Sequence, residues 1–259
     1  IHMVSLNISL NKEHFIDKVS IDLATFYEKL KQDDMVARTS QPSTAEFTRR
    51  YQYLSTHYDS IISIHLSGKG SGTIEAAKRA ARTLPKTKIT VIDSKTYTGA
   101  LGLVVVHAAR NACSNMSHHE IVDCVHHSIS HISWFTLIPD LSYLVRGGRT
   151  TLGKKRMLDL IRGMPIISTN TDGSVKFKGV VWGRRRMVRS FVNYVNTHVD
   201  KKKRYSIAIT HCDSARQAAQ LTAEMKYLFK DIDLIYNTDC STMIACYGGP
   251  GALSVSLQE

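Results

Sequence analysis

The residues whose types best fit a binding site form a glycine-rich segment at 66–73, which reads Leu-Ser-Gly-Lys-Gly-Ser-Gly-Thr. It follows an apolar, strand-like run and precedes a helical pattern that begins near Ile74. Such a loop presents backbone N–H groups at the positive end of a helix dipole, and its hydroxyl groups add donors, which is typical of an anion site. It has neither a Walker A ending nor dinucleotide spacing, which favours an anion other than a nucleotide phosphate. A plain strand-to-helix turn with Thr73 as N-cap fits the local sequence equally well.

Two further polar positions lie where a ligand could be reached. Thr39 stands just before a capping box formed by Ser43 and Glu46, and because the cap does not use it, its hydroxyl is free to point into a crevice. Asp93 and Ser94 follow a strand-like run, at the carboxyl end where open α/β sheets bind ligands. A plain loop threonine and a helix N-cap are the competing interpretations of these two positions.

Other groups that could carry chemistry are less specific. Residues 144–149 read Leu-Val-Arg-Gly-Gly-Arg and residues 247–251 read Tyr-Gly-Gly-Pro-Gly, but Gly-Gly commonly marks only a helix end or a turn. His127 and His131 have the spacing of metal ligands, yet with only Asp123 nearby a solvated helix face is favoured and no metal is expected. No Ser-His-Asp order, nucleophile elbow or carboxylate pair can be assembled, which argues against hydrolytic catalysis.

The segments that must position these residues alternate between strand and helix patterns. In the first half, apolar runs at 61–66 and 89–93 alternate with helical patterns at 74–84 and from Thr98 onward. This rhythm predicts parallel strands with helices on both faces of their sheet. The helix after Asp93 is apolar around most of its circumference, so it must be enclosed by protein.

From Trp134 onward the pattern changes and predicts a second, mixed sheet. We therefore expect an α/β protein with a parallel-sheet domain at residues 4–131 and a mixed-sheet domain at residues 132–259. The strand-like runs of the second half lie at 135–138, 165–168, 175–181, 205–210, 233–236 and 252–257, with helices near 185–198 and 214–229.

Composition limits the class of protein. The 259 residues are 43% hydrophobic and 22% charged, and no apolar run approaches the roughly 18 residues that a membrane span requires. Five cysteines without a CxxC pair and an N-terminus without a secretory signal predict a cytoplasmic protein with reduced thiols. The net charge of +12 and the basic runs at 184–186 and 201–204 invite a nucleic-acid interpretation, but neither run forms a motif, so a solvated surface is favoured.

Taken together and in order, several segments resemble the DegV family, and the match runs from about residue 4 to the C-terminus. The resemblance implies two α/β domains with the ligand between them. The segments that carry it are Thr39-Ser40-Gln41-Pro42-Ser43, residues 64–73, Asp93-Ser94, residues 144–149 and Gly249-Pro250-Gly251.

The function that the resemblance implies is that of a carrier rather than an enzyme. Such a carrier needs no cofactor, buries one long-chain fatty acid and presents the carboxylate to a separate fatty acid kinase, which forms the acyl phosphate. By this resemblance Thr39 and Ser71 are carboxylate ligands, assisted by the backbone N–H of Gly72 and by Tyr247. We expect Ser67, Thr73, Asp93 and Ser94 to support the loop, and Arg149, Arg184, Arg185 and Arg186 to face the kinase.

The chain departs from the family pattern at three places. We expect the family's first strand, which ends in Asp-Ser, to be missing from this chain. Gly70 replaces the leucine that usually precedes Ser-Gly-Thr, which loosens the loop, and Tyr247 replaces the histidine that usually contacts the carboxylate. Two other functions stay open: an enzyme for a small phosphorylated or carboxylated substrate at the same loop, and a nucleic-acid binder that uses the basic surface.

Overall fold

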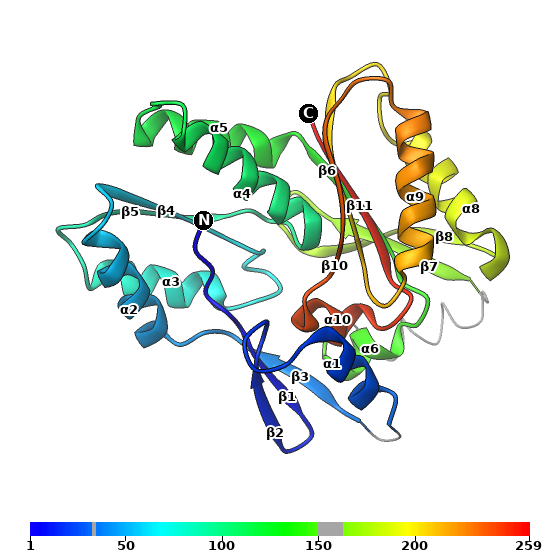
Figure 1. The fold of residues 1–259 in the computed structure, drawn as a ribbon, viewed down its shortest axis with the longest axis horizontal. Helices are drawn as coiled ribbons and strands as arrows, with labels where there is room; N and C mark the ends of the chain where they lie inside the picture. Colours follow the sequence, from blue (N-terminus) through cyan, green and yellow to red (C-terminus); the bar gives the residue numbers. More distant parts are fainter. Residues whose placement is uncertain (33–34, 150–162) are drawn as a thin grey trace.

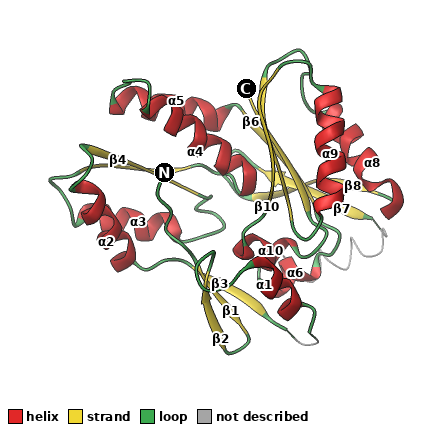
Figure 2. Ribbon diagram, viewed as in Figure 1, coloured by secondary structure: helices red, strands yellow, loops and turns green. Residues whose placement is uncertain are grey.

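The computed structural model describes residues 1–32, 35–149 and 163–259, and within them the strands form three sheets (Figure 1). The first is a parallel pair, β4 (Ser60–His65) and β5 (Lys88–Asp93). Helices cover both faces of this pair, as the sequence predicted (Figure 2). Those helices are α2 (Thr44–Ser55) and α3 (Thr73–Arg82) on one face, and α4 (Thr98–Ala112) and α5 (His118–Ser130) on the other.

Alternation along β4 explains why the pair is buried on both faces. Ile61 packs with Phe47 and Tyr51 of α2 in one core cluster. Ile62 and Ile64 pack instead in a second cluster with residues of α4 and α5. Because successive side chains of a strand point to opposite faces, one short apolar strand serves both helix layers.

The second sheet is mixed and six-stranded, in the order β10-β9-β11-β6-β7-β8, which confirms the predicted change of pattern. Among its described strands β10 and β9 are parallel, while the other neighbours are antiparallel. Its strands are β6 (Ile132–Leu137), β7 (Met164–Thr169), β8 (Val175–Val181), β9 (Tyr205–His211), β10 (Ile232–Asp239) and β11 (Leu253–Gln258).

The helices α8 (Met187–Asn196) and α9 (Ala215–Leu228) cover one face of the six-stranded sheet, and α4 lies against the other (Figure 1). Helix α4 thus lies between the two sheets, which confirms that it is enclosed. Its close approach depends on Gly99, where an added Cβ would lie 2.9 Å from the Cβ of Ala208. None of the described helices is both long and apolar enough to cross a membrane.

The third sheet is antiparallel and was not predicted. It has the order β2-β1-β3 and consists of β1 (Asn7–Leu10), β2 (Glu13–Ile16) and β3 (Ala37–Ser40). Around it lie α1 (Leu23–Leu30) and two short helices from the second half of the chain, α6 (Ser142–Arg146) and α10 (Thr242–Gly248).

One core cluster joins Ile8 and Phe26 to Ala245 and Cys246 of α10. The N-terminal sheet therefore shares its core with the last part of the chain, so this core crosses the predicted boundary near residue 132. The division into domains at 4–131 and 132–259 stays a prediction.

Two local predictions about caps have different outcomes. Ser43 is the N-cap of α2 in a complete capping box with Glu46, as predicted. Thr73 is not an N-cap: Gly72 precedes α3, and Thr73 is the first helical residue.

A prediction about a turn near the C-terminus is partly wrong. Residues 247–248, read as the start of that turn, belong to α10, and the turn begins at Gly249, whose φ is 67°.

Candidate binding site

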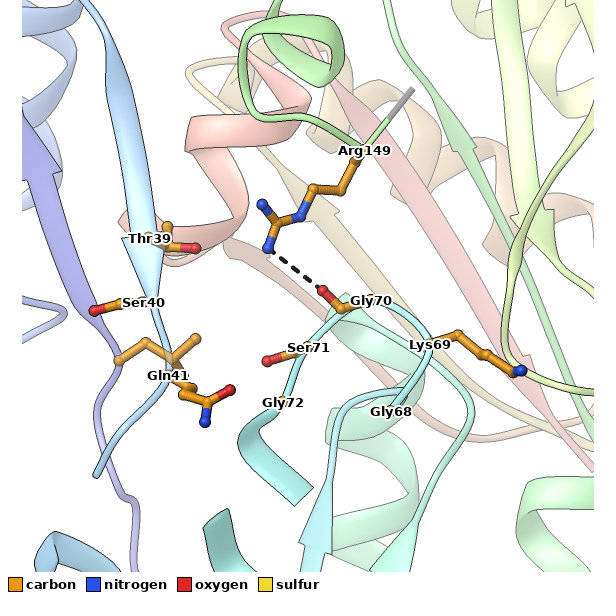
Figure 3. A pocket seen from close by; sticks show the side chains of 10 residues that line it. Thr39, Ser40, Gln41, Gly68, Lys69, Gly70, Ser71, Gly72 and Arg149 are labelled. Atoms are coloured by element: carbon orange, nitrogen blue, oxygen red, sulfur yellow. Dashed lines mark hydrogen bonds between the residues drawn. The ribbon is translucent and has the colours of Figure 1, made fainter. Parts of the chain in front are cut away.

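A pocket of about 520 Å³ lies where the end of β3, the loop at 66–72 and Arg149 meet (Figure 3). Strand β3 brings Thr39 and the following residues to one side, and the loop between β4 and α3 brings Ser71 and Gly72 to the other. The structure thus places Thr39, Ser71 and Gly72 around one space, although β3 and the loop are distant in sequence. The lining residues are Leu6, Thr39, Ser40, Gln41, Gly68, Lys69, Gly70, Ser71, Gly72 and Arg149.

Tyr247 reaches the edge of this site from α10. It is not among the residues that line the pocket, but its hydroxyl group and that of Thr39 form a hydrogen bond. The ring is half-buried and packs beside Leu144. Tyr247 therefore contacts Thr39, which is itself predicted to bind the carboxylate. A direct contact between Tyr247 and the carboxylate stays a prediction.

Ser71 is held by its neighbour Thr73. The two hydroxyl oxygens are 2.8 Å apart, and the Thr73 amide donates to Ser71 Oγ at 3.3 Å. Thr73 itself is only 3% exposed, so it fixes the Ser71 hydroxyl without reaching the pocket. The Gln41 side chain packs directly against Gly72, because a Cβ added to Gly72 would lie 1.9 Å from Gln41 Oε1.

The amide groups of the loop are mostly engaged inside the protein. The amide of Gly68 donates to the Asp93 carboxylate at 3.1 Å, and that of Lys69 donates to Ser67 Oγ at 3.2 Å. The amides of Gly70 and Ser71 both donate to the Ser67 carbonyl. The prediction that this loop directs its amides outward is therefore wrong for Gly68 to Ser71, and Gly72 is left as the candidate amide ligand.

Two of the residues predicted to support the loop, Ser67 and Asp93, form hydrogen bonds with it or from it to neighbouring segments. The Ser67 hydroxyl donates to the Gly173 carbonyl at 2.8 Å, which ties the loop to the turn before β8. The Asp93 carboxylate connects the loop to the segment after β5, because it accepts from the Gly68 amide and also from the Lys95 amide at 2.8 Å. The Ser94 hydroxyl lies 3.1 Å from that of Thr96, and neither Asp93 nor Ser94 caps α4, whose N-cap is Tyr97.

Arg149 lies at the pocket, where the sequence analysis did not place it. Its guanidinium donates to the carbonyl of Gly147 at 2.7 Å and to that of Gly70 at 3.4 Å, and its Cζ lies 4.5 Å from the centre of the Tyr247 ring. Arg184, Arg185 and Arg186 instead form an exposed 3₁₀ turn between β8 and α8 and line no part of the pocket. The four arginines predicted as one partner surface thus occupy two different places.

Sequence reasoning missed Gln41 and Tyr97 as part of the site. Tyr97 lies over Gly70, donates to the Gly173 carbonyl at 3.3 Å and packs edge-on against Trp134. Burial raises the pKa of Tyr97, so it stays a neutral donor. Gln41 lies in a segment that carries the family resemblance, but its role and that of Tyr97 depend on contacts with Gly72 and Gly70, which are distant in the chain and leave no periodic pattern in the sequence.

Gly70→Ala should destabilise the fold by about 1–3 kcal/mol, because the added Cβ would lie 2.3 Å from the Tyr97 hydroxyl and 3.0 Å from its ring. The backbone of Gly70 is not in the left-handed region, so the glycine is needed for space. Urea unfolding measures the effect. Tyr97→Phe removes the nearest atom and should reduce the cost of Gly70→Ala, and additive effects of the two changes would contradict this account.

The matched control is Gly102→Ala on α4. An added Cβ there would meet nothing within 4 Å, so this change should leave stability unaltered or raise it by up to about 1 kcal/mol.

Comparison with known proteins agrees with this architecture. The family model described as "Uncharacterised protein, DegV family" matches residues 1–259. A DegV domain-containing protein of Caldanaerobacter subterraneus subsp. tengcongensis is 30% identical over 260 residues, which cover 100% of this chain and 91% of that protein.

Two solved structures share the fold. A DegV family protein from Thermus thermophilus, described by its fatty acid binding, has a TM-score of 0.90 at 22% identity and covers 99% of this chain and 91% of its own. The Streptococcus pneumoniae Fatty Acid Kinase (Fak) B3 protein, loaded with linoleic acid, has a TM-score of 0.88 at 19% identity and covers 98% of this chain and 90% of its own. The family model spans the whole chain, and the chain therefore belongs to the DegV family.

Proposed function

We propose that this protein is a carrier that buries one long-chain fatty acid and binds its carboxylate at the pocket. The observation that carries the proposal is the pocket itself, which gathers the Thr39 and Ser71 hydroxyls and the Arg149 guanidinium and has no carboxylate among the described residues that line it. Donors without a competing carboxylate suit an anionic head group. Fatty acid binding by DegV relatives of the same fold supports this choice of anion.

The acyl chain would supply most of the affinity. A C16 fatty acid has about 14 methylene groups, and at roughly 0.8 kcal/mol each their burial could provide on the order of 11 kcal/mol before ordering costs. The hydroxyl groups at the pocket then need only orient the carboxylate. Affinity from the acyl chain and orientation from the hydroxyl groups fit a carrier, which must hold the acyl chain and leave the head group accessible.

Extraction with organic solvent and mass spectrometry tests the proposal directly. Protein purified from cells should release about one fatty acid per chain on the carrier function. Lipid-free protein should also bind added palmitate. A purified protein that releases no fatty acid and does not bind palmitate would refute the carrier function, and release of a small phosphorylated compound would point to an enzyme.

We further propose that the carrier acts in the cytoplasm and hands its carboxylate to a fatty acid kinase, without catalysing a reaction itself. A relative of the same fold is called a Fatty Acid Kinase B3 protein, which supports a kinase partner. All five cysteines are free thiols, which supports a reducing compartment.

The exposed arginines of the 3₁₀ turn provide the test of the kinase contact. Replacing Arg184, Arg185 and Arg186 together with alanine should slow kinase-dependent phosphorylation of the bound fatty acid, more strongly at low salt, because exposed charges steer association. Palmitate affinity should be unchanged. The matched control is replacement of Lys201, Lys202 and Lys203, an equal charge at another exposed turn, and equal slowing by both variants would exclude a specific contact.

A further inference from the structure

Two buried cysteines lie opposite each other at the ends of neighbouring parallel strands. Cys212 directly follows β9, and Cys240 directly follows β10. The last residues of the two strands, His211 and Asp239, are register partners. The Cys240 amide donates to the His211 carbonyl at 2.7 Å, so the parallel ladder continues and places Cys240 opposite Cys212. Neighbouring strands lie about 4.7–4.9 Å apart, and cysteines joined by a disulfide have Cα atoms about 4.4–6.8 Å apart, so the backbone suits a disulfide.

The two side chains also point into the same core. Cys212 is 1% exposed and Cys240 is 8% exposed, and both belong to the cluster that contains Tyr27 and Cys246. Their thiol groups are hydrogen-bonded to each other. Because the backbone register and the direction of both side chains are already set, a disulfide requires only that the two sulfur atoms move closer.

The thiols of this cluster differ in acidity. The hydrogen bond from Cys212 lowers the pKa of Cys240, although burial opposes this effect. The same hydrogen bond and burial raise the pKa of Cys212. Burial raises the pKa of the neighbouring Cys246 to about 12, so that thiol stays protonated. The thiolate is the form that reacts with peroxide, and Cys240 is therefore the reactive member of the pair.

The pair borders helix α10, which carries Tyr247. Cys240 lies two residues before this helix begins. Cys212 holds the segment after the helix, because its carbonyl accepts from the Gly251 amide at 2.7 Å. A bond between the two sulfur atoms would tie the start of α10 to the strand that holds its end. The hydroxyl group that α10 presents to Thr39 lies between these two attachments.

We propose that Cys240 and Cys212 form a reversible disulfide with hydrogen peroxide as oxidant, and that this bond weakens ligand binding by displacing α10. The Cys240 thiolate attacks one peroxide oxygen, the O–O bond breaks, and Cys240 becomes a sulfenic acid while hydroxide is released and takes up a proton. The Cys212 thiol then attacks that sulfur, the S–O bond breaks, and the hydroxyl leaves with the thiol proton as water. Two thiols thus lose two electrons in total, and one peroxide is reduced to two molecules of water.

Peptide mapping of peroxide-treated protein tests the disulfide. The remaining thiols are blocked with iodoacetamide, and the unreduced protein is cleaved with trypsin. The fragment with Cys212, residues 205–216, should be linked to fragment 231–259, and dithiothreitol should separate them. Because fragment 231–259 also contains Cys246, the link should persist in Cys246→Ala and disappear in Cys240→Ala. A link to Cys246, or no link in the wild type, would overturn the proposal.

Dimedone, which labels sulfenic acids, tests the order of attack. In Cys212→Ala the sulfenic acid on Cys240 has no partner, so peroxide should leave Cys240 labelled. In Cys240→Ala the Cys212 thiol should stay unlabelled. No label in the first variant, or a label on Cys212 in the second, would show that Cys240 does not attack the peroxide.

Palmitate affinity tests the link to the binding site, and this part of the proposal rests on the proposed function. The oxidised wild type should bind palmitate at least about threefold more weakly than the reduced protein, and dithiothreitol should restore binding. Cys240→Ala should bind palmitate equally well with and without peroxide. Unchanged affinity of the cross-linked protein would overturn the effect on α10. A reduced protein that fails to bind palmitate refutes the carrier function itself, and peptide mapping then decides the disulfide independently.

Discussion

Ser71→Ala and Thr39→Ala should each weaken palmitate binding by roughly ten- to a hundredfold. Each change deletes a hydroxyl group that lines the pocket and would donate to the carboxylate. A hydrogen bond to a charged group contributes roughly 1.5–3 kcal/mol, and about 1.4 kcal/mol corresponds to a factor of ten in affinity. Direct titration of lipid-free protein with palmitate measures the change.

Stability of the lipid-free variants separates binding from folding. Neither hydroxyl is fully buried, and among the described residues each bonds to one other side chain, so urea unfolding should show a loss of about 1 kcal/mol or less. Ser40→Ala is the matched control: Ser40 also lines the pocket, but its hydroxyl points away from Ser71 and Arg149 in Figure 3. Losses of stability as large as the losses of affinity would make both residues structural and would end the head-group assignment.

Periodicity was sufficient to predict most of the fold. The apolar run that contains β4 packs against helices on both faces, and a continuous apolar run bounded by turn residues is how such a strand appears in sequence. Helix α4 was predicted to be enclosed for the same reason, and it lies between two sheets.

The N-terminal antiparallel sheet could not be predicted in this way. Its three strands are four residues long, and β3 reads Ala-Arg-Thr-Ser with only Ala37 buried. Four residues span two alternations at most, which is too few to separate a strand from a loop. The sheet is stabilised by its contact with α10, more than 200 residues away in sequence, and no local pattern reports such a contact.

The site shows the same limit. Motif order and family resemblance were enough to choose Thr39, Ser71 and Gly72, and the structure brings these three together. The position of Arg149 over Tyr247 depends on the residues that follow α6 and on helix α10, which meet only in three dimensions. The sequence does not reveal which arginines face solvent and which line a pocket. The structure shows that residues 184–186 form an exposed turn and that Arg149 lies at the pocket.

Acid should destabilise this protein through His65, which is the last residue of β4 and directly precedes the binding loop. Burial lowers the pKa of His65 to about 4, against a reference of 6.5, and the nearby Asp93 charge opposes this only in part. The Tyr51 hydroxyl donates to Ser63 Oγ at 2.7 Å, and Ser63 Oγ lies 2.8 Å from His65 Nε2, which accepts from the Ser63 hydroxyl when the neutral ring carries its proton on Nδ1. Protonation of Nε2 would replace that acceptor with a donor, which favours the neutral ring.

The direction of the effect follows from the lowered pKa. Above pH 6.5 the ring is neutral in both the folded and the unfolded chain, so the stability is fully present. Between pH 6.5 and about 4 the unfolded chain takes up the proton and the folded one does not, so stability falls with pH. At about 1.36 kcal/mol for each pH unit, the loss by pH 4.5 is about 2–3 kcal/mol.

Urea unfolding at pH 7.5 and 4.5 measures this loss. His65→Gln keeps a group that can accept from Ser63 but has no proton to gain, so the variant should lose about 2–3 kcal/mol less than the wild type over that interval. Burial also lowers the pKa values of His107 and His118, so part of the acid sensitivity should remain in the variant. His126→Gln, at an exposed position of α5, should retain the full wild-type loss. If His65→Gln also retains it, the ring is not held neutral in the fold, and acid loosens the binding loop by another route.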